Sequence, residues 1–161
     1  MLRLVVFNLL LFGCLFYAWL RGGGPEKAAA TILAVGSLVT PVFGSDFAVR
    51  FSSVEVGVLV VDIVVLAGLL LVALSAERLW PLWVVALHIV GMAAHGVRMV
   101  DPTIMRWAYG FAIAFWSYPM LLLIIVGTWR HQQRLARFGA DKSWSSFFGR
   151  SAAKRKTGAT G

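Results

Sequence analysis

Charged side chains are scarce in this sequence, since Asp, Glu, Lys and Arg make up 14% of its 161 residues. Soluble domains carry about 25% charged and about 45–50% apolar residues, whereas this chain is 60% apolar. A compact soluble domain of this length cannot bury so much apolar surface. Disordered chains lack aromatic and branched residues, but this one has 11 Phe, 7 Trp and long Val/Leu runs. The composition therefore predicts an integral membrane protein.

Cysteine is almost absent, with Cys14 as the single example. This excludes an intrachain disulfide and a structural zinc site built from two or more cysteines of one chain. The sequence also lacks a nucleophile elbow, a P-loop, a Rossmann glycine pattern and a zinc-protease helix. It shows no internal repeat, and five spans cannot be divided into two inverted halves. A transporter built from this chain would therefore need more than one copy.

Long apolar runs are what the chain does have. A spanning helix needs about 20 apolar residues, and five segments approach or reach that length: residues 4–20, 28–43, 54–74, 80–97 and 107–128. The second is short and contains Pro41, so it either crosses at a tilt or ends in a loop there. Barrel strands would alternate polar and apolar residues, which residues 57–74 do not. The expected fold class is an all-α, polytopic bundle of about five transmembrane helices.

The N-terminal segment also resembles a secretory signal, because Arg3 precedes an apolar stretch that reaches Cys14. The apolar run continues beyond Cys14 to Leu20, however, and no small-x-small cleavage site precedes Arg21. We therefore expect an uncleaved first helix.

Orientation follows from Lys and Arg, which are enriched in cytoplasmic loops. Placing the C-terminal tail inside puts eleven of them on the inner side, and leaves four outside: Arg3, Arg50, Arg98 and Arg106. This distribution predicts a bacterial inner-membrane type of protein with a cytoplasmic C-terminus and, given five spans, an external N-terminus.

The chain divides into an expected transmembrane domain, residues 1–128, and a basic, aromatic cytoplasmic tail, residues 129–161. Eight Lys or Arg residues of the tail are interleaved with Phe138, Trp144, Phe147 and Phe148, a pattern that suits the headgroup region. The expected partners are the lipid bilayer, its anionic headgroups at the tail, and a homo-oligomer or larger membrane complex. No motif indicates binding to nucleic acid.

Two ionisable residues, Asp62 and His88, fall deep inside the third and fourth expected spans. At 1.5 Å per residue they lie roughly 12 and 15 Å below the same boundary, so adjacent antiparallel helices would bring them together. An unpaired charge at the bilayer centre costs about 3 kcal/mol or more, which makes His88 the expected partner of Asp62. Such an intramembrane polar pair would be a proton relay, a ligand site, or a structural hydrogen bond that fixes helix packing.

A second polar layer is expected nearer that boundary, where Glu55 matches the depth of His95 and Arg98. Seven-residue spacings place Glu55 on the face of Asp62, and His95 on the face of His88. Gly91 shares that second face and is a helix-packing position where a neighbour can approach closely. Pro119 falls within the fifth segment and marks a kink or hinge.

Metal and haem sites are disfavoured, because His88 and His95 lie about 10 Å apart along one helix and His131 falls in the tail. We expect no metal or other cofactor, and the sequence assigns no catalytic residue. It favours a non-enzymatic accessory or assembly subunit, or a solute-linked or proton-linked membrane module. The alternative is a membrane-embedded enzyme or a metal-binding or haem-binding electron-transfer component.

Overall fold

The computed structural model describes residues 2–44, 55–101, 103, 105–141, 143 and 144. The regular secondary structure in this part of the chain is helical, and an isolated β-bridge joins Ala76 to Trp144. Five helical units in it are long and apolar enough to cross a membrane, which confirms the predicted helix class and number of spanning-length units. The helices are α1 (Leu2–Arg21), α2 (Gly24–Phe43), α3 (Val56–Ser75), α4 (Trp80–Val100), α5 (Arg106–Phe115) and α6 (Ser117–Phe138).

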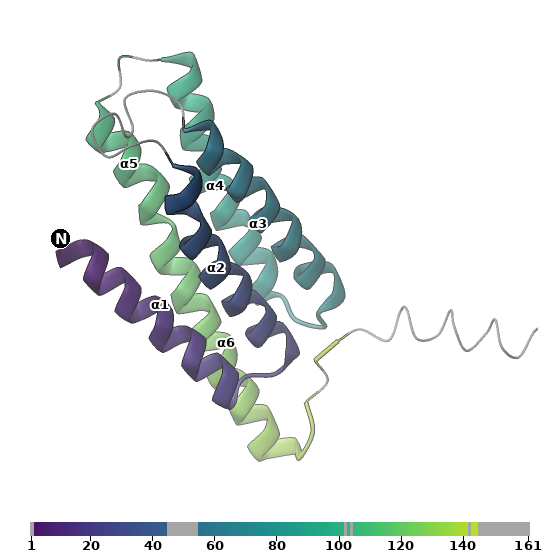
Figure 1. Ribbon diagram of the computed structural model, residues 1–161. Coiled ribbons are helices and arrows are strands. Elements are labelled where there is room, and N and C mark those ends of the chain that lie inside the picture. Colours follow the sequence, from purple (N-terminus) through teal and green to yellow (C-terminus); the bar gives the residue numbers. More distant parts are fainter. Residues whose placement is uncertain (1, 45–54, 102, 104, 142, 145–161) are drawn as a thin grey trace, which may run out of the picture.

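The long helices form one elongated bundle (Figure 1). Helix α2 packs between α1 and α3, α4 packs on α3 and α6, and α6 returns to pack on α1 and α2. Helix α5 packs on α4 near one end of the bundle. The core is apolar and draws on five helices; its members include Leu11, Cys14, Ala34, Val65, Leu69, Val84, Leu121 and Ile124.

Glycines allow α2 and α3 to approach closely. A Cβ atom added at Gly36 would lie 2.6 Å from Cγ2 of Val65, and one at Gly68 would lie 3.2 Å from Cδ1 of Ile32. Small residues at helix interfaces permit such short distances between backbones. The pairing fixes how α3, and with it Asp62, is placed against the rest of the bundle.

Helix α2 begins four residues earlier than expected and continues through Pro41 to Phe43. Pro25 lies in its first turn, where a missing N–H leaves no hydrogen bond unmade. The Glu26 carboxylate accepts a hydrogen bond from the Gly23 N–H at 3.1 Å, which caps the helix start. Of the two sequence-based alternatives, a loop that begins at Pro41 is therefore wrong for this segment.

The fifth apolar segment is divided at Trp116 into α5 and α6. Pro119 has no N–H to donate, and its ring interferes with the carbonyl group four residues earlier, that of Phe115. The expected kink thus lies just before the proline. Helix α6 then extends ten residues past the expected end of the span, at Thr128, to Phe138, and Gly139 follows it with a φ of 69°. The expected domain boundary at 128/129 falls inside this helix.

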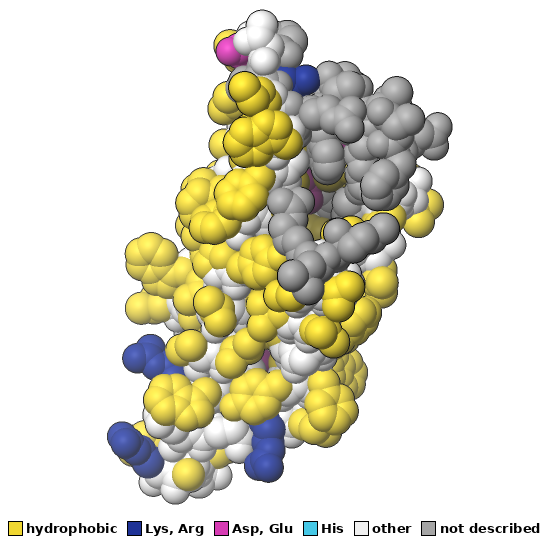
Figure 2. Space-filling model, turned by 90° about the vertical axis from the view of Figure 1, so that its left-hand side faces the viewer, with side chains coloured by type: hydrophobic (Ala, Val, Ile, Leu, Met, Phe, Trp, Pro, Cys, Tyr) yellow, Lys and Arg dark blue, Asp and Glu magenta, His cyan; other side chains and the backbone are white. Residues whose placement is uncertain are grey.

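Apolar side chains cover much of the face shown in Figure 2, and several Lys and Arg side chains gather towards its lower end. On α1, the side chains of Leu9, Phe16 and Trp19 are more than half exposed. Exposed apolar surfaces of this extent are typical of membrane or protein contacts.

Candidate functional site

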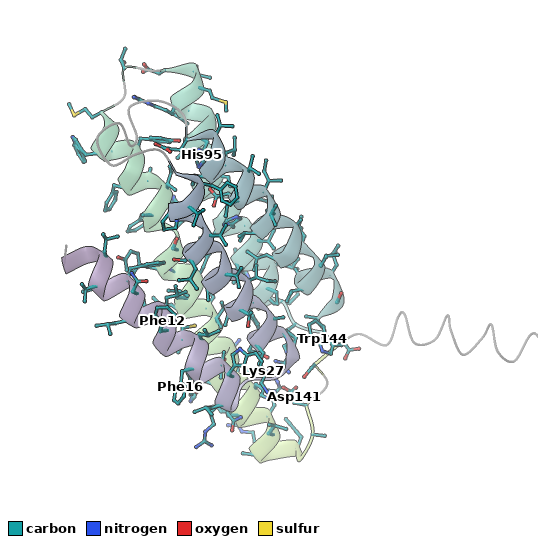
Figure 3. The ribbon with its side chains drawn as sticks, in the orientation of Figure 1. Phe12, Phe16, Lys27, His95, Asp141 and Trp144 are labelled. Atoms are coloured by element: carbon teal, nitrogen blue, oxygen red, sulfur yellow. The ribbon has the colours of Figure 1, made fainter. Side chains whose placement is uncertain are left out.

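Buried and half-buried polar side chains gather in two clusters at opposite ends of the bundle. Figure 3 labels His95 near the upper end, and Asp141 and Trp144 near the lower end. The upper cluster lies between α3, α4 and α5 and comprises Glu55, Asp62, His88, His95, Arg98 and Tyr109. The lower cluster lies at the ends of α2, α4 and α6 and comprises Glu26, Arg78, Trp80, His131, Arg134 and Asp141.

A short hydrogen-bonded chain forms the centre of the upper cluster. The Glu55 backbone N–H donates to the Tyr109 hydroxyl oxygen at 3.4 Å, and that hydroxyl lies 2.8 Å from Nδ1 of His95. All three residues are buried. The Tyr109 oxygen can accept from Glu55 and still donate its own hydrogen to Nδ1. In that arrangement Nε2 of His95 carries the ring proton when the imidazole is neutral.

Asp62 completes this chain on the far side of His95. Its Oδ2 atom lies 3.3 Å from Nε2 of His95, although Nε2 has no well-aligned hydrogen-bond partner in the described part of the chain. The contact is therefore mainly electrostatic. His95 thus has a hydroxyl on one ring nitrogen and a carboxylate near the other.

His88 has a different contact from the one expected. Its Nε2 atom lies 2.9 Å from the backbone carbonyl oxygen of Asp62, while the Asp62 carboxylate lies near His95. The expectation that the two polar layers are separate, with Asp62 in one and His95 in the other, is corrected by this arrangement. His88 contacts the backbone of α3 and supports its position relative to α4.

The positions of the helix ends explain why the Asp62 carboxylate lies near His95 rather than His88. Helix α3 begins at Val56 and α4 extends to Val100, each about two residues later than the boundaries used for the depth estimate. From these ends, Asp62 is about 9 Å deep, His95 about 7.5 Å and His88 about 18 Å. The depth of Asp62 therefore matches that of His95 more closely.

The remaining residues of the second polar layer adjoin the same site. The Arg98 guanidinium carbon lies 5.8 Å from the centre of the Tyr109 ring, within the range of a cation–π contact. Arg98 and Glu55 are buried, with exposed fractions of 6% and 2%. The cluster thus places both acidic and basic groups of α3 and α4 around one histidine.

Gly91 and Pro119 lie away from this chain of contacts. A Cβ atom at Gly91 would meet Trp116 at 3.5 Å, an ordinary packing distance, so this glycine faces the break between α5 and α6. Pro119 lines a shallow apolar groove with Trp83, Leu87 and Leu122 among others. Both residues therefore contribute to packing around the divided fifth segment.

Glu26 lies at the centre of the lower cluster and has no exposed surface. Its Oε1 atom forms an ion pair with Nη1 of Arg78 and accepts a hydrogen bond from Trp80 Nε1 at 3.2 Å. Its other oxygen accepts from the Gly23 N–H. A buried carboxylate is stable only when its lone pairs are satisfied in this way.

Asp141 lies just past the end of α6 and contacts three basic side chains. Its Oδ2 atom lies 2.5 Å from both Arg78 Nη2 and His131 Nδ1, and Oδ1 lies 2.9 Å from Arg134 Nε. Burial raises the pKa of Asp141, but the hydrogen bonds from Arg134 and His131 and the charges of Arg78 and Arg134 outweigh it and lower that pKa. Because a carboxylate can only accept, His131 Nδ1 is the donor.

Sequence reasoning did not identify the lower cluster. It counted Arg78 only as a topology signal and placed His131 in the tail, because the cluster requires three segments to meet. A usable signal was present: Glu26 in the first turn of an apolar helix, and Asp141 close behind the helix-ending Gly139.

Within the described residues, no group of three or more His, Cys, Asp or Glu side chains is close enough to hold a metal ion. Comparisons with protein-family models, curated proteins and solved structures found no match. The upper cluster thus brings a hydroxyl and a carboxylate to the two ring nitrogens of His95.

Proposed function

We propose that this chain is a small multi-pass membrane protein that works as a proton-linked membrane module, without enzymatic chemistry of its own. The observation that supports this proposal is the position of His95 between the Tyr109 hydroxyl and the Asp62 carboxylate. Histidine changes its charge between pH 5 and 8 in an ordinary environment. Ionisable groups inside membrane spans commonly belong to ion or proton pathways.

The Asp62 carboxylate would stabilise the protonated form of His95 from the Nε2 side of the ring. A charge on the imidazolium would be balanced by Asp62, whereas the neutral ring accepts from Tyr109 at Nδ1. Protonation adds the second ring proton at Nδ1, so the Tyr109 hydroxyl on α5 turns from donor to acceptor there, and the positive charge strengthens the attraction to the Asp62 carboxylate on α3. Proton binding at this point would therefore alter how strongly α4 is held against α3.

Nuclear magnetic resonance of ¹⁵N-labelled histidine tests this proposal in the full chain reconstituted in lipid nanodiscs. We expect the His95 ring signals to change as the pH is lowered from 8 to 5, and to be missing in His95→Gln. Asp62→Asn should alter that change, because the carboxylate 3.3 Å from Nε2 of His95 is lost. His131→Gln is the matched control and should leave the His95 signal in place. A His95 signal that stays constant over this pH range would contradict the proposal.

We also propose the orientation, with the lower end of the bundle in the cytoplasm of a bacterial cell and the spans in its inner membrane. The supporting feature is the excess of Lys and Arg in the lower loops and in the tail. In a Cys14→Ala background, Glu77→Cys should react with a membrane-impermeant reagent only after the inner face is opened. Thr103→Cys should react in intact cells. Labelling of both sites from one side would contradict the five-span topology.

An accessory or assembly subunit is the second candidate. It is favoured by the lower cluster, where Arg78 forms ion pairs with both Glu26 and Asp141 and so joins three segments of the chain, as in a structural network. Affinity purification in mild detergent tests this role directly. A stoichiometric partner or a defined homo-oligomer would favour it, whereas a monomer with a titrating His95 would favour the proton-linked module.

A further inference from the structure

The lower cluster contains more hydrogen-bond donors than its two carboxylates use. Nε of Arg78 and Nη2 of Arg134 are buried and have no hydrogen-bond partner in the described part of the chain. Arg78 itself is 5% exposed. Asp141 offers only two oxygens, and one of them is shared by Arg78 and His131. A single carboxylate thus leaves part of this cationic site unsatisfied.

A phosphate group fits this donor set better than a carboxylate does. A phosphate monoester has three terminal oxygens and up to two negative charges, and arginine binds phosphate through paired N–H groups. Glu26 would still neutralise Arg78 after Asp141 left the site. The Arg134 guanidinium would remain to attract an anion, so the empty site would stay cationic.

Asp141 follows the end of α6 together with Gly139, Ala140, Ser143 and Trp144, and these five residues are called the docked segment. Trp144 forms the isolated β-bridge with Ala76, and its ring occupies the position that a side chain on Gly24 would fill, 2.3 Å from an added Cβ atom. Trp144 nevertheless remains 44% exposed. The ion pairs of Asp141 are therefore the main polar contacts that hold this segment in place.

We propose that Arg78, His131 and Arg134 form a phosphate-binding site that Asp141 occupies as a ligand from within the chain, and that a phosphate group displaces Asp141 and releases Trp144 from its contact with Ala76. The Arg134 side chain is 36% exposed, which gives an incoming phosphate access to the site. The site lies beyond the apolar part of α6, at the end of the bundle where Figure 3 labels Asp141 and Trp144. The phosphate belongs either to a lipid headgroup or to a soluble phosphate.

Release of the segment can be followed by ¹⁹F resonance of the full chain labelled with 5-fluorotryptophan in phosphatidylcholine nanodiscs. Trp144→Phe assigns the Trp144 signal. Inorganic phosphate is added in one arm, nanodiscs containing phosphatidic acid are used in a second, and sodium chloride of equal ionic strength in a third. We expect the Trp144 signal to move towards its solvent-exposed position with phosphate or with phosphatidic acid, and not with chloride. The arm that responds identifies the source of the phosphate.

Single substitutions distinguish a specific phosphate site from a general effect of ions on the ion pairs of Asp141. Asp141→Asn should move the Trp144 signal without any phosphate. Arg134→Gln should keep Trp144 docked through Arg78 and His131, but raise the phosphate concentration needed by about tenfold or more, as expected for loss of a charge-assisted hydrogen bond. Arg130→Gln, an exposed neighbour on the same helix, should respond like the unmodified chain.

Three results would overturn the proposal. The Trp144 signal could stay unchanged with both phosphate sources, or respond equally to chloride, which would reduce the effect to screening of ion pairs. It could also stay unchanged in Asp141→Asn, which would show that Asp141 does not hold the segment. Circular dichroism of each variant identifies a loss of fold.

Discussion

Oδ2 of Asp62 lies 3.3 Å from Nε2 of His95, and this contact joins α3 to α4 inside the upper part of the bundle. His88, on the same face of α4, lies 2.9 Å from the backbone carbonyl oxygen of Asp62 through its Nε2 atom. The two histidines therefore depend on different parts of Asp62, one on its side chain and the other on its backbone. A change in the charge of Asp62 acts directly on His95, whereas His88 responds to movement of the α3 backbone.

A double-mutant cycle should distinguish these two contacts. Asp62→Ala and His95→Ala are expected to be coupled in stability, by about 0.6 kcal/mol and at most about 1.7 kcal/mol, as for polar contacts between membrane helices. The cycle of Asp62→Ala with His88→Ala should show weaker coupling, because the carbonyl of residue 62 survives the substitution. Equilibrium unfolding in mixed micelles measures both cycles. Stronger coupling of Asp62 with His88 would contradict the structure.

The close approach of α2 and α3 makes Gly36 intolerant of larger side chains. Gly36→Ala should destabilise the fold by about 1–3 kcal/mol, since the added methyl group meets Val65 at 2.6 Å and overpacks the interface. Val65→Ala should restore part of that loss by making room. Thermal unfolding in detergent gives the measurement.

Gly13→Ala is the matched control for this change. Nothing lies within 4 Å of a Cβ atom added at Gly13, and alanine has the higher helix propensity by about 0.8–1.0 kcal/mol. We expect Gly13→Ala to be neutral or stabilising. Equal losses at both positions would show that the α2–α3 approach is not the cause.

Acid should release the segment that contains Asp141. The pKa of this carboxyl is lowered in the folded chain, so its ionised form stabilises the docked segment. That contribution is complete above the ordinary pKa of aspartate, about 3.9, and is lost as pH falls through the lower folded value. Limited proteolysis between pH 7 and 3, with an acid-active protease at the low end, should show cleavage after residue 138 only at the acid end. In Asp141→Asn the segment should be cleaved at every pH. The same pH dependence of cleavage in this variant as in the unmodified chain would contradict the prediction.

Pro119→Ala should make the fifth segment more continuous. The new N–H can donate to the Phe115 carbonyl, so the turn at Trp116 loses its cause. Straightening should move Tyr109 relative to His95. The higher helix propensity of alanine should stabilise the helix by up to about 3 kcal/mol, less the packing energy lost with the proline ring. A distance between spin labels on α5 and α6 measures the change. An unaltered distance would show that packing of Trp116 against Gly91 maintains the break.

The fold was largely predictable from the sequence because apolar length alone determines where spanning-length helices form. Helix ends were less predictable. Pro25 and Glu26 extend α2 towards the N-terminus through capping, an effect that a hydropathy window does not register. Pro119 did indicate the kink, but its consequence appears at Trp116, because a proline disturbs the turn before it.

The residues of a polar site could be predicted only where they come from two neighbouring helices of the bundle. Asp62, His88 and His95 were recognised as ionisable residues inside spans, yet an error of about two residues at each helix end was enough to exchange the partner of Asp62. Glu26, Arg78 and Asp141 were missed because no periodicity connects a helix start, a loop and a segment after the last helix. The expectations for Arg50 and for most of the tail lie outside the described residues.

The break at Trp116 also has a mechanical consequence. Tyr109 is attached to α5 and His131 to α6, so the fifth segment contacts a polar cluster at each of its ends. An uninterrupted helix would behave as a rigid rod and pass rotation at one end straight to the other. Interrupted backbone hydrogen bonding at Trp116 makes it two rods joined by a pivot, and the pivot absorbs small rotations. Each end of the molecule can thus change its local arrangement without forcing the other to follow.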